Sequence, residues 1–245
     1  SLGRTEATGY GVIYTLREAL KDKGLKPADT VASIQGFGNV AQYAARLFIE
    51  LGGTVVSVSC WDNVDRKAYT FRKKEGIAVD ELMGATDSFG SIAKNKARDI
   101  GYEVLDAEAW MEQEVDVLIP SALENQITPA NFNKISPRVK MIVEGANGPT
   151  TPDADELIKQ KGIYIIPDFL ANAGGVTCSY FEQVQCNMNY FWEKDEVLEK
   201  LDTKMTNAFH AVNNLAKTDG LYMRDAAYVI AINRVAEAVK KRGWV

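Results

Sequence analysis

The sequence is poor in the side chains that most often build metal sites, disulfides and histidine-dependent active sites. Its 245 residues include one histidine, His210, and three cysteines. Cys60, Cys178 and Cys186 are widely spaced and form no CxxC pair, so they predict neither a disulfide framework nor a zinc site. We therefore expect no metal centre and a reducing, cytoplasmic setting. His210 lies in a long helical pattern, which favours a surface or packed histidine over a catalytic base.

Long apolar runs and an excess of positive charge are also missing. No stretch approaches the roughly 20 apolar residues that a membrane helix needs, and no secretory signal is visible. The formal net charge is -5, and the two basic clusters at 72–74 and 240–242 are short. Such clusters are typical of solvated helix ends and not of a phosphate-binding track. We expect neither a membrane nor a nucleic acid as a partner.

Short apolar strands alternate with helices through the first two thirds of the chain. Hydrophobic residues make up 46% of the sequence, enough for a sizeable core. Thr5 is expected to cap the first helix and Gly24 to end it. This alternation predicts an α/β fold with a Rossmann-type, doubly wound, mostly parallel sheet. The expected helices are 6–23, 40–51 and 153–161, with less regular helical pieces near 66–75 and 106–113, and the expected strands are 30–35, 54–59, 115–119, 140–143 and 163–166.

After Gly174 the pattern changes to helices alone. Three helical segments follow with no strand between them, at 176–192, 195–218 and 223–241. We interpret residues 1–245 as one dinucleotide-binding domain, with a Rossmann core at about 28–170 flanked by helices at 5–24 and by a helical tail at 174–245. Because the first residue is Ser1 and not methionine, we expect the chain to be a processed or excised piece.

A glycine turn lies between the first predicted strand and the helix that follows it. Gly36-Phe37-Gly38-Asn39-Val40-Ala41 fits the pattern G-x-G-x-x-A. In this motif the first glycine allows a tight turn, the second lets a pyrophosphate approach the backbone, and the small third residue lets the helix pack close to its strand. The helix N-terminus offers free N–H groups and a positive dipole end. Strand, turn, helix and strand fill about 30 residues, so we predict a dinucleotide site and not a purely structural turn. The residues predicted to bind it here are Gly36, Phe37, Gly38, Asn39 and Val40.

The end of the second strand bears on the choice between NAD and NADP. An acidic side chain there bonds the ribose hydroxyls of NAD and repels the 2′-phosphate of NADP. Cys60 occupies the expected acidic position, Trp61 follows it, and Asp62 comes two residues later. Asp62 can still reach the ribose, whereas Ser59 and Arg66 would tolerate a phosphate. We predict that Cys60, Trp61 and Asp62 bind the adenosine end of NAD, with NADP left open.

Several segments, in this order and spacing, resemble the cofactor domain of glutamate dehydrogenases in the amino acid dehydrogenase family. The resemblance covers essentially the whole chain. In that family a preceding domain carries the catalytic lysine and aspartate, so the resemblance implies that this chain is the cofactor half alone, with no catalytic residue to assign. The segments are 3–11 (GRTEATGYG), 120–125 (PSALEN), 144–152 (EGANGPTTP), 172–176 (NAGGV) and 242–244 (RGW).

The resemblance implies cofactor contacts beyond the glycine turn. Thr8 and Asn172 would bond the nicotinamide carboxamide and fix which face of the ring meets the substrate, while Ala122 and Asn147 would line the adenosine and ribose side of the cleft. Each residue also has a simpler interpretation. Thr8 could stabilise a helix start, Asn147 could form a turn, and Asn172 could belong to an ordinary helix-entry loop.

The resemblance also implies a substrate wall. Val176 and Ser179 would form the face of the substrate pocket that this domain supplies, with Arg4 at its border. Ser179 would bond the side-chain carboxylate of glutamate, whereas leucine, phenylalanine and valine dehydrogenases would need an apolar wall, because a buried hydroxyl without a partner costs about 1–3 kcal/mol. Alternatively, Ser179 bonds its own helix backbone.

The intact enzyme implied by this resemblance oxidatively deaminates L-glutamate to 2-oxoglutarate and ammonia, with an amino acid as its small-molecule partner. The full-length enzyme would be a homo-hexamer, and the oligomeric state of the present chain stays open. Two alternatives remain at this point. One is the cofactor domain of a leucine, phenylalanine or valine dehydrogenase, and the other is a non-catalytic nucleotide-sensing module.

Overall fold

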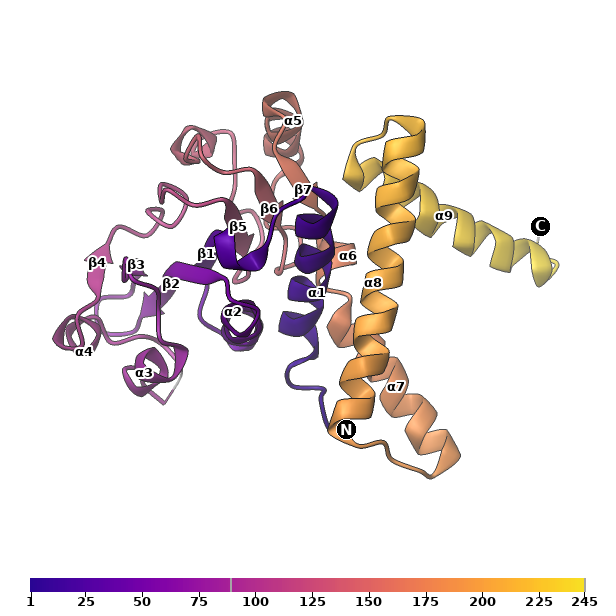
Figure 1. Cartoon of the computed structure of the whole chain (residues 1–245), viewed down its shortest axis with the longest axis horizontal. Helices are drawn as coiled ribbons and strands as arrows, with labels where there is room; N and C mark the ends of the chain where they lie inside the picture. Colours follow the sequence, from indigo (N-terminus) through magenta and orange to yellow (C-terminus); the bar gives the residue numbers. More distant parts are fainter. Residues whose placement is uncertain (89, 245) are drawn as a thin grey trace.

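A seven-stranded sheet forms the centre of the computed structural model, which describes residues 1–88 and 90–244 (Figure 1). The strands are β1 (Val31–Gln35), β2 (Thr54–Asp62), β3 (Lys67–Arg72), β4 (Glu103–Leu105), β5 (Val117–Pro120), β6 (Met141–Val143) and β7 (Tyr164–Ile166). Their order across the sheet is β4-β3-β2-β1-β5-β6-β7. Strands β2, β1, β5, β6 and β7 are parallel, whereas β3 pairs antiparallel with β2 and with β4. This topology confirms the predicted Rossmann-type α/β fold.

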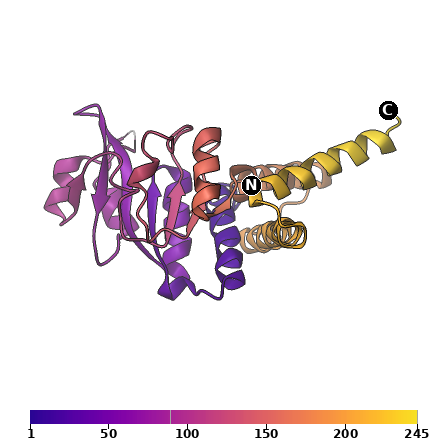
Figure 2. The same ribbon diagram turned by 90° about the horizontal axis from the view of Figure 1, so that it is seen from above.

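Helices cover both faces of the sheet. Figure 2 shows α1 and α2 on one face and α5 on the other, and both views show α9 running away from the sheet. The helices are α1 (Ala7–Asp22), α2 (Asn39–Glu50), α3 (Val79–Gly84), α4 (Lys94–Asp99), α5 (Pro152–Lys161), α6 (Asp168–Ala171), α7 (Gly174–Met188), α8 (Lys194–Asp219) and α9 (Met223–Lys241), with short 3-10 turns at Pro27–Asp29 and Phe132–Lys134. Among the described residues, no helix is both long and apolar enough to cross a membrane.

The central strands are apolar because both of their faces are covered. Ile34 of β1, Leu118 of β5, Ile142 of β6 and Ile165 of β7 are completely buried. Parallel strands of this kind read as continuous apolar runs, since no face is left for water. The burial of these strands accounts for the agreement between the predicted and observed positions of β1, β5, β6 and β7.

The charged stretch between β2 and β5 differs from the prediction. The helix expected near 66–75 is wrong, because residues 67–72 form β3 and pair with β2. Tyr69, Thr70 and Phe71 are aromatic or β-branched, and such side chains favour a strand. The helix expected at 106–113 is also wrong. That segment forms successive turns, anchored by the buried Trp110 and Met111.

The two ends of α1 differ in how well the sequence predicted them. The residue at the N-cap is Glu6, with no side-chain capping bond, so the expected Thr5 cap is wrong. At the other end Gly24 has φ +68°, and the N–H of Leu25 donates to the carbonyl of Leu20 at 2.8 Å. This is the Schellman arrangement, in which glycine takes the left-handed conformation after the last turn.

Asp62 fixes the turn that joins β2 to β3. One carboxylate oxygen accepts the N–H groups of Val64 at 2.8 Å and Asp65 at 2.9 Å, and the other accepts the N–H of Lys94 at 3.1 Å. Burial alone would raise the pKa of Asp62, but these backbone bonds lower it more, so the pKa lies below its ordinary value of 3.8. A carboxyl group with a lowered pKa stabilises the fold when ionised.

We predict that Asp62→Asn lowers the free energy of unfolding at pH 7 by about 1–3 kcal/mol, because an amide NH₂ would face the Lys94 N–H. Since the folded pKa is depressed, the stability from ionised Asp62 is complete above pH 3.8 and is lost as the pH falls through the folded pKa. Urea unfolding at pH 7 and at pH 3 should therefore show a smaller difference in the free energy of unfolding between wild type and Asp62→Asn at pH 3.

The exposed Asp219→Asn at the end of α8 is the control, with an expected change below about 0.5 kcal/mol. A difference between wild type and Asp62→Asn that does not shrink at pH 3 would contradict the assignment.

Candidate functional site

A crevice opens where the chain changes direction across the sheet. From β1 the chain passes to β2 on one side, and it later returns to form β5 on the other. In such sheets, ligands bind beyond the carboxyl ends of the strands at this switch point. Gly36 follows β1 with φ +105°, and a Cβ on it would lie 3.0 Å from the Cβ of Ala122, which follows β5. The turn therefore requires glycine both for its backbone conformation and for its close contact with β5.

Gly38 is different, because the fold itself does not require a glycine there. Its backbone is extended, and a Cβ on it would meet no atom within 4 Å. Gly38 is also the N-cap of α2, so it offers no side chain to the unpaired N–H groups of the first helical turn. The space beside Gly38 is therefore open to an anion, which the helix dipole attracts. Ala41, the small third residue of the motif, is fully buried.

The remaining residues of the turn are held by side-chain bonds. The Ser59 hydroxyl accepts the N–H of Gly36 at 3.1 Å, and the Gln42 amide donates to the carbonyl of Phe37 at 2.7 Å. Phe37 itself is buried in the core, so only its backbone can face a ligand. Ser59 is also buried. The sequence suggested that Ser59 could tolerate a phosphate, whereas the structure uses it to hold the turn. Asn39 donates to the Thr5 carbonyl at 2.6 Å.

A cavity of about 710 Å³ continues from the switch point along the carboxyl ends of β5 and β6. It gathers more than half of the residues predicted from the motif and the family resemblance. These are Arg4, Thr8, Val40, Ala122, Asn147, Asn172, Val176 and Ser179. Six further residues line it that were not predicted as site residues, although all but Phe169 lie in the segments that carry the resemblance. They are Ser121, Gly145, Ala146, Phe169, Ala173 and Gly175.

Glycines bring the walls of this cavity together. A Cβ on Gly145 would lie 2.4 Å from the Ser121 hydroxyl, and a Cβ on Gly175 would lie 2.4 Å from the Thr8 hydroxyl. Both contacts are shorter than any side chain tolerates without a shift of its neighbour. Such glycines are the sequence signal that could have indicated these walls.

Two amides meet across the cavity. The Asn172 side chain donates to the Asn147 side-chain oxygen at 2.8 Å and to the Ala146 carbonyl at 3.3 Å. The structure thus brings together two residues that are 25 positions apart in sequence. A turn-forming Asn147 and a helix-entry Asn172 would have no need to contact each other. Their contact therefore favours a shared role at the cavity.

Ser179 has two partners within this chain. Its hydroxyl accepts from Arg4 Nε at 3.1 Å and donates to the Gly175 carbonyl at 3.2 Å. The second bond is the backbone bond considered as the simpler alternative. Val176 beside it is exposed. Arg4, Val176 and Ser179 therefore lie together on one side of the cavity, with the hydroxyl already oriented.

The three residues at the end of β2 lie outside this cavity, on the far side of the glycine turn. Trp61 is about half exposed, at 49%. Cys60 is partly buried, and burial raises the pKa of its thiol. Asp62 is only 2% exposed and its carboxylate is occupied by backbone N–H groups. The expectation that Asp62 reaches a ribose is therefore not favoured by its position here.

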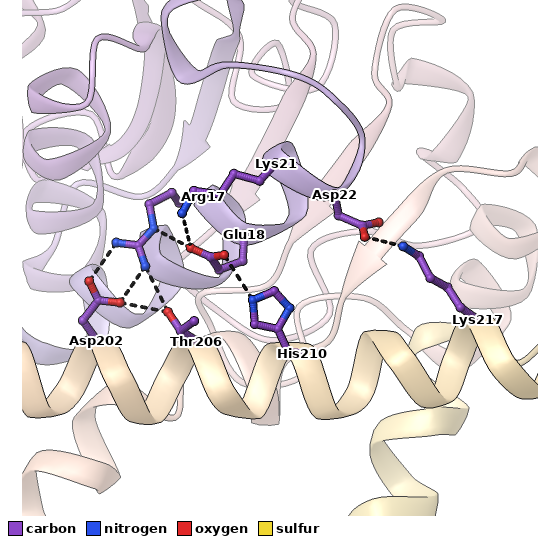
Figure 3. Close-up of polar contacts among 8 residues, drawn as sticks. All are labelled: Arg17, Glu18, Lys21, Asp22, Asp202, Thr206, His210 and Lys217. Atoms are coloured by element: carbon purple, nitrogen blue, oxygen red, sulfur yellow. Dashed lines mark hydrogen bonds and ion pairs between the residues drawn. The ribbon is translucent and has the colours of Figure 1, made fainter.

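Helix α1, which carries Thr8 near its start, is fixed along its length. Close packing holds its first half, because a Cβ on Gly174 of α7 would lie 2.1 Å from the Ala7 carbonyl oxygen. Ion pairs with α8 hold its second half (Figure 3). Arg17 donates to both oxygens of Asp202 at 2.8 and 2.6 Å. Glu18, Lys21, Thr206 and His210 belong to the same network, and Asp22 forms a separate ion pair with Lys217. The single histidine is thus an exposed residue at a helix interface, 3.2 Å from Glu18.

A second cavity, of about 620 Å³, lies at the amino ends of β6 and β7 and contains none of the predicted residues. Four lysines border it, namely Lys23, Lys140, Lys159 and Lys217. Three of them already pair with Asp116, Asp225 and Asp22. Residues 1–88 and 90–244 contain no group of three or more His, Cys, Asp or Glu side chains arranged to hold a metal ion.

Comparison with known proteins identifies relatives of the whole chain. Residues 1–243 match the family model described as Glutamate/Leucine/Phenylalanine/Valine dehydrogenase. A glutamate dehydrogenase of Thermotoga maritima is 43% identical over 244 residues, which are 99% of this chain and 56% of that protein. An NAD-specific glutamate dehydrogenase of Staphylococcus aureus is 38% identical over 245 residues, again 56% of its length.

A solved structure agrees with these matches. The crystal structure of glutamate dehydrogenase from Peptoniphilus asaccharolyticus superposes with a TM-score of 0.83 at 34% identity, over 100% of this chain and 55% of that one. The chain therefore spans about half the length of the relatives that it matches. From its sequence and its fold, this chain belongs to the Glutamate/Leucine/Phenylalanine/Valine dehydrogenase family.

Proposed function

We propose that this chain binds NAD(H) in the crevice at the switch point and orients it for hydride transfer. One observation carries the proposal, namely the open space at Gly38 over the N-terminus of α2. The backbone conformation of Gly38 would suit any residue, and no neighbouring atom excludes a side chain there. A pyrophosphate that must approach the backbone would explain why this position holds glycine. The cavity beginning at Val40 has room for the rest of the cofactor.

The cofactor contacts follow from this placement. The N–H groups at the start of α2 would bind the pyrophosphate, and the residues at the end of β2 would border the adenosine. The resemblance put Asn147 on the adenosine and ribose side of the cleft, but its amide oxygen accepts from Asn172 at 2.8 Å, so we assign it to the ribose of the nicotinamide half. Thr8 and Asn172 would hold the neighbouring carboxamide. When bound, NAD supplies the hydride acceptor, and these side chains fix its orientation. NAD is proposed over NADP because the Staphylococcus aureus relatives are named NAD-specific.

We predict that Gly38→Ala weakens NADH binding by at least about tenfold, because its methyl group would occupy the space that the pyrophosphate approaches. Its melting temperature should stay within about 2 °C of the wild type, since no protein atom lies within 4 Å of that Cβ. Energy transfer from tryptophan to NADH measures the affinity. Gly84→Ala, in open space on α3, is the matched control and should bind like the wild type. Equal affinity of the Gly38 variant and the wild type would refute the placement.

We propose that the full-length enzyme oxidises L-glutamate to 2-oxoglutarate and ammonia and that it is a hexamer, a state that the structure of a similar hetero-hexameric glutamate dehydrogenase from Thermus thermophilus supports. The glutamate dehydrogenase names of its relatives support this substrate, and the chain's span of about half their length implies that other groups complete the reaction. General acid–base groups from the rest of the enzyme would move the protons when the cleft closes and excludes water. The present chain alone is therefore expected to bind the cofactor without turnover.

Within this enzyme Ser179 is proposed to contact the side-chain carboxylate of glutamate. We expect Ser179→Ala in the full-length enzyme to lower kcat/KM for glutamate by roughly 10–100-fold, mostly through KM, because the lost hydroxyl leaves a charged group with fewer partners. Steady-state kinetics with glutamate and with leucine measure the change. Thr177→Ala, two residues away on α7, is the control.

Unchanged glutamate kinetics in Ser179→Ala would exclude this contact. If Ser179→Ala raised turnover of leucine and left turnover of glutamate unchanged, the alternative of a branched-chain amino acid dehydrogenase would be favoured.

A further inference from the structure

One arginine of α9 reaches the segments that form the far wall of the cleft. Arg224 is mostly buried, with 17% of its side chain exposed, and neither the glycine motif nor the family resemblance pointed to it. Its Nη2 donates to Glu144 Oε1 at 2.9 Å, and its Nε donates to Asp155 Oδ2 at 2.8 Å. Glu144 directly follows β6, and its side chain is fully buried. The cleft loop after β6 therefore begins at an ion pair with α9.

Asp168, the first residue of α6, closes this network. Its Oδ1 lies 3.5 Å from Arg224 Nη1, and its Oδ2 accepts the N–H of Gly148 at 2.9 Å. Its own N–H donates to Glu144 Oε2 at 2.9 Å. The network thus links α9, the loop after β6 and the start of α6 in a closed ring of hydrogen bonds and ion pairs. Arg224 contacts both linked segments, the loop after β6 through Glu144 and the start of α6 through Asp168.

Each linked segment carries a polar side chain of the cleft. Asn147 lies in the loop after β6, and Asn172 follows α6, and the two are joined by the 2.8 Å amide bond. A second contact with α9 supports the same wall. Phe169, which lines the cleft, packs its ring 4.7 Å from the ring of Tyr228. Helix α9 therefore supports the wall at two points without itself lining the cavity.

The charge balance explains why this support is sensitive to one residue. Burial raises the pKa of Glu144, and the bond from Arg224 acts against that rise. A buried carboxylate without its partner must either take up a proton or move toward water, and breaking such a pair is strongly destabilising. Arg224 also joins three carboxylates through one planar guanidinium, a geometry that the ammonium group of a lysine does not reproduce.

We infer that Arg224 is a positioning residue for the nicotinamide end of the cofactor. It holds the loop after β6 and the start of α6 at the spacing that lets Asn147 and Asn172 meet. The inference rests on the proposed function of the cleft. The adenosine end would lie against other elements, namely the glycine turn, the end of β2 and Ala122 after β5. Loss of Arg224 should therefore weaken binding of the nicotinamide end more than binding of the adenosine end.

Calorimetric titration with two ligands tests whether Arg224 affects the nicotinamide end more than the adenosine end. NADH spans the whole cleft, whereas ADP carries the adenosine and both phosphates but no nicotinamide. For Arg224→Met we expect the Kd for NADH to rise by about tenfold, because two wall segments must be ordered on binding, while the Kd for ADP stays within about twofold. Arg224→Lys keeps the charge and should show an intermediate loss for NADH.

Matched variants separate positioning from general instability. Arg138→Met breaks an ion pair with another largely buried carboxylate, Asp116, which is 8% exposed and lies at the amino end of β5, and it should leave both affinities unchanged. Should Arg224→Met fail to fold, the double variant Arg224→Met/Glu144→Gln applies the same test without an uncompensated buried charge. Unchanged NADH affinity in a folded variant, or an equal loss for ADP, would overturn the inference.

Hydrogen exchange tests whether Arg224 holds the wall without relying on cofactor binding. The amides of Gly148 and Asp168 are bonded inside the network and should exchange at least about tenfold faster in Arg224→Met than in the wild type. If wild-type protein does not bind NADH, the proposed function fails, and exchange alone then decides whether Arg224 holds the wall. Unchanged exchange at both amides would show that it does not.

Discussion

The parallel pairing of β1 with both β2 and β5 is the constraint on which the rest of this molecule depends. It forces the chain to leave β1 on one side and to return on the other, and so it opens a crevice at the carboxyl ends of the strands. The contact of Gly36 with Ala122 lies at that point. The segments of the proposed cofactor site follow the carboxyl ends of β1, β2, β5 and β6 or pack against a segment that does.

Buried and partly buried polar interactions hold the walls of the crevice in place. Ser59 and Gln42 hold the turn after β1, and Asp62 holds the end of β2. The network around Arg224 holds the loop after β6 and the start of α6. These contacts differ in kind from the exposed ion pairs elsewhere on the surface, such as Lys241 with Glu237, which contribute little to stability.

Much of the fold and part of the site could be predicted because the relevant signals are local. Apolar runs mark β1, β5, β6 and β7, and the glycine turn gives the position of a phosphate-binding site. Strand β3 was missed because its charged ends resemble a helix surface, and its pairing with β2 is visible only in three dimensions. The ribose contact of Asp62 stays a prediction, and sequence position could not show that three backbone N–H groups donate to its carboxylate.

Arg224 could not have been found in this way. It is 80 residues from Glu144, and a basic residue near the start of a helix is usually solvated. The family resemblance located Thr8, Asn147, Asn172 and Ser179, and the structure shows that these four line one cavity. Which atoms of a cofactor each would touch depends on a bound ligand, so their individual roles stay predictions.

A structure of this chain determined with NADH tests the central claim most directly. The account predicts the pyrophosphate against the backbone at Gly38 and the start of α2, with the nicotinamide between Thr8 and Asn172. A dinucleotide bound elsewhere, for example in the lysine-bordered cavity at the amino ends of β6 and β7, would contradict it.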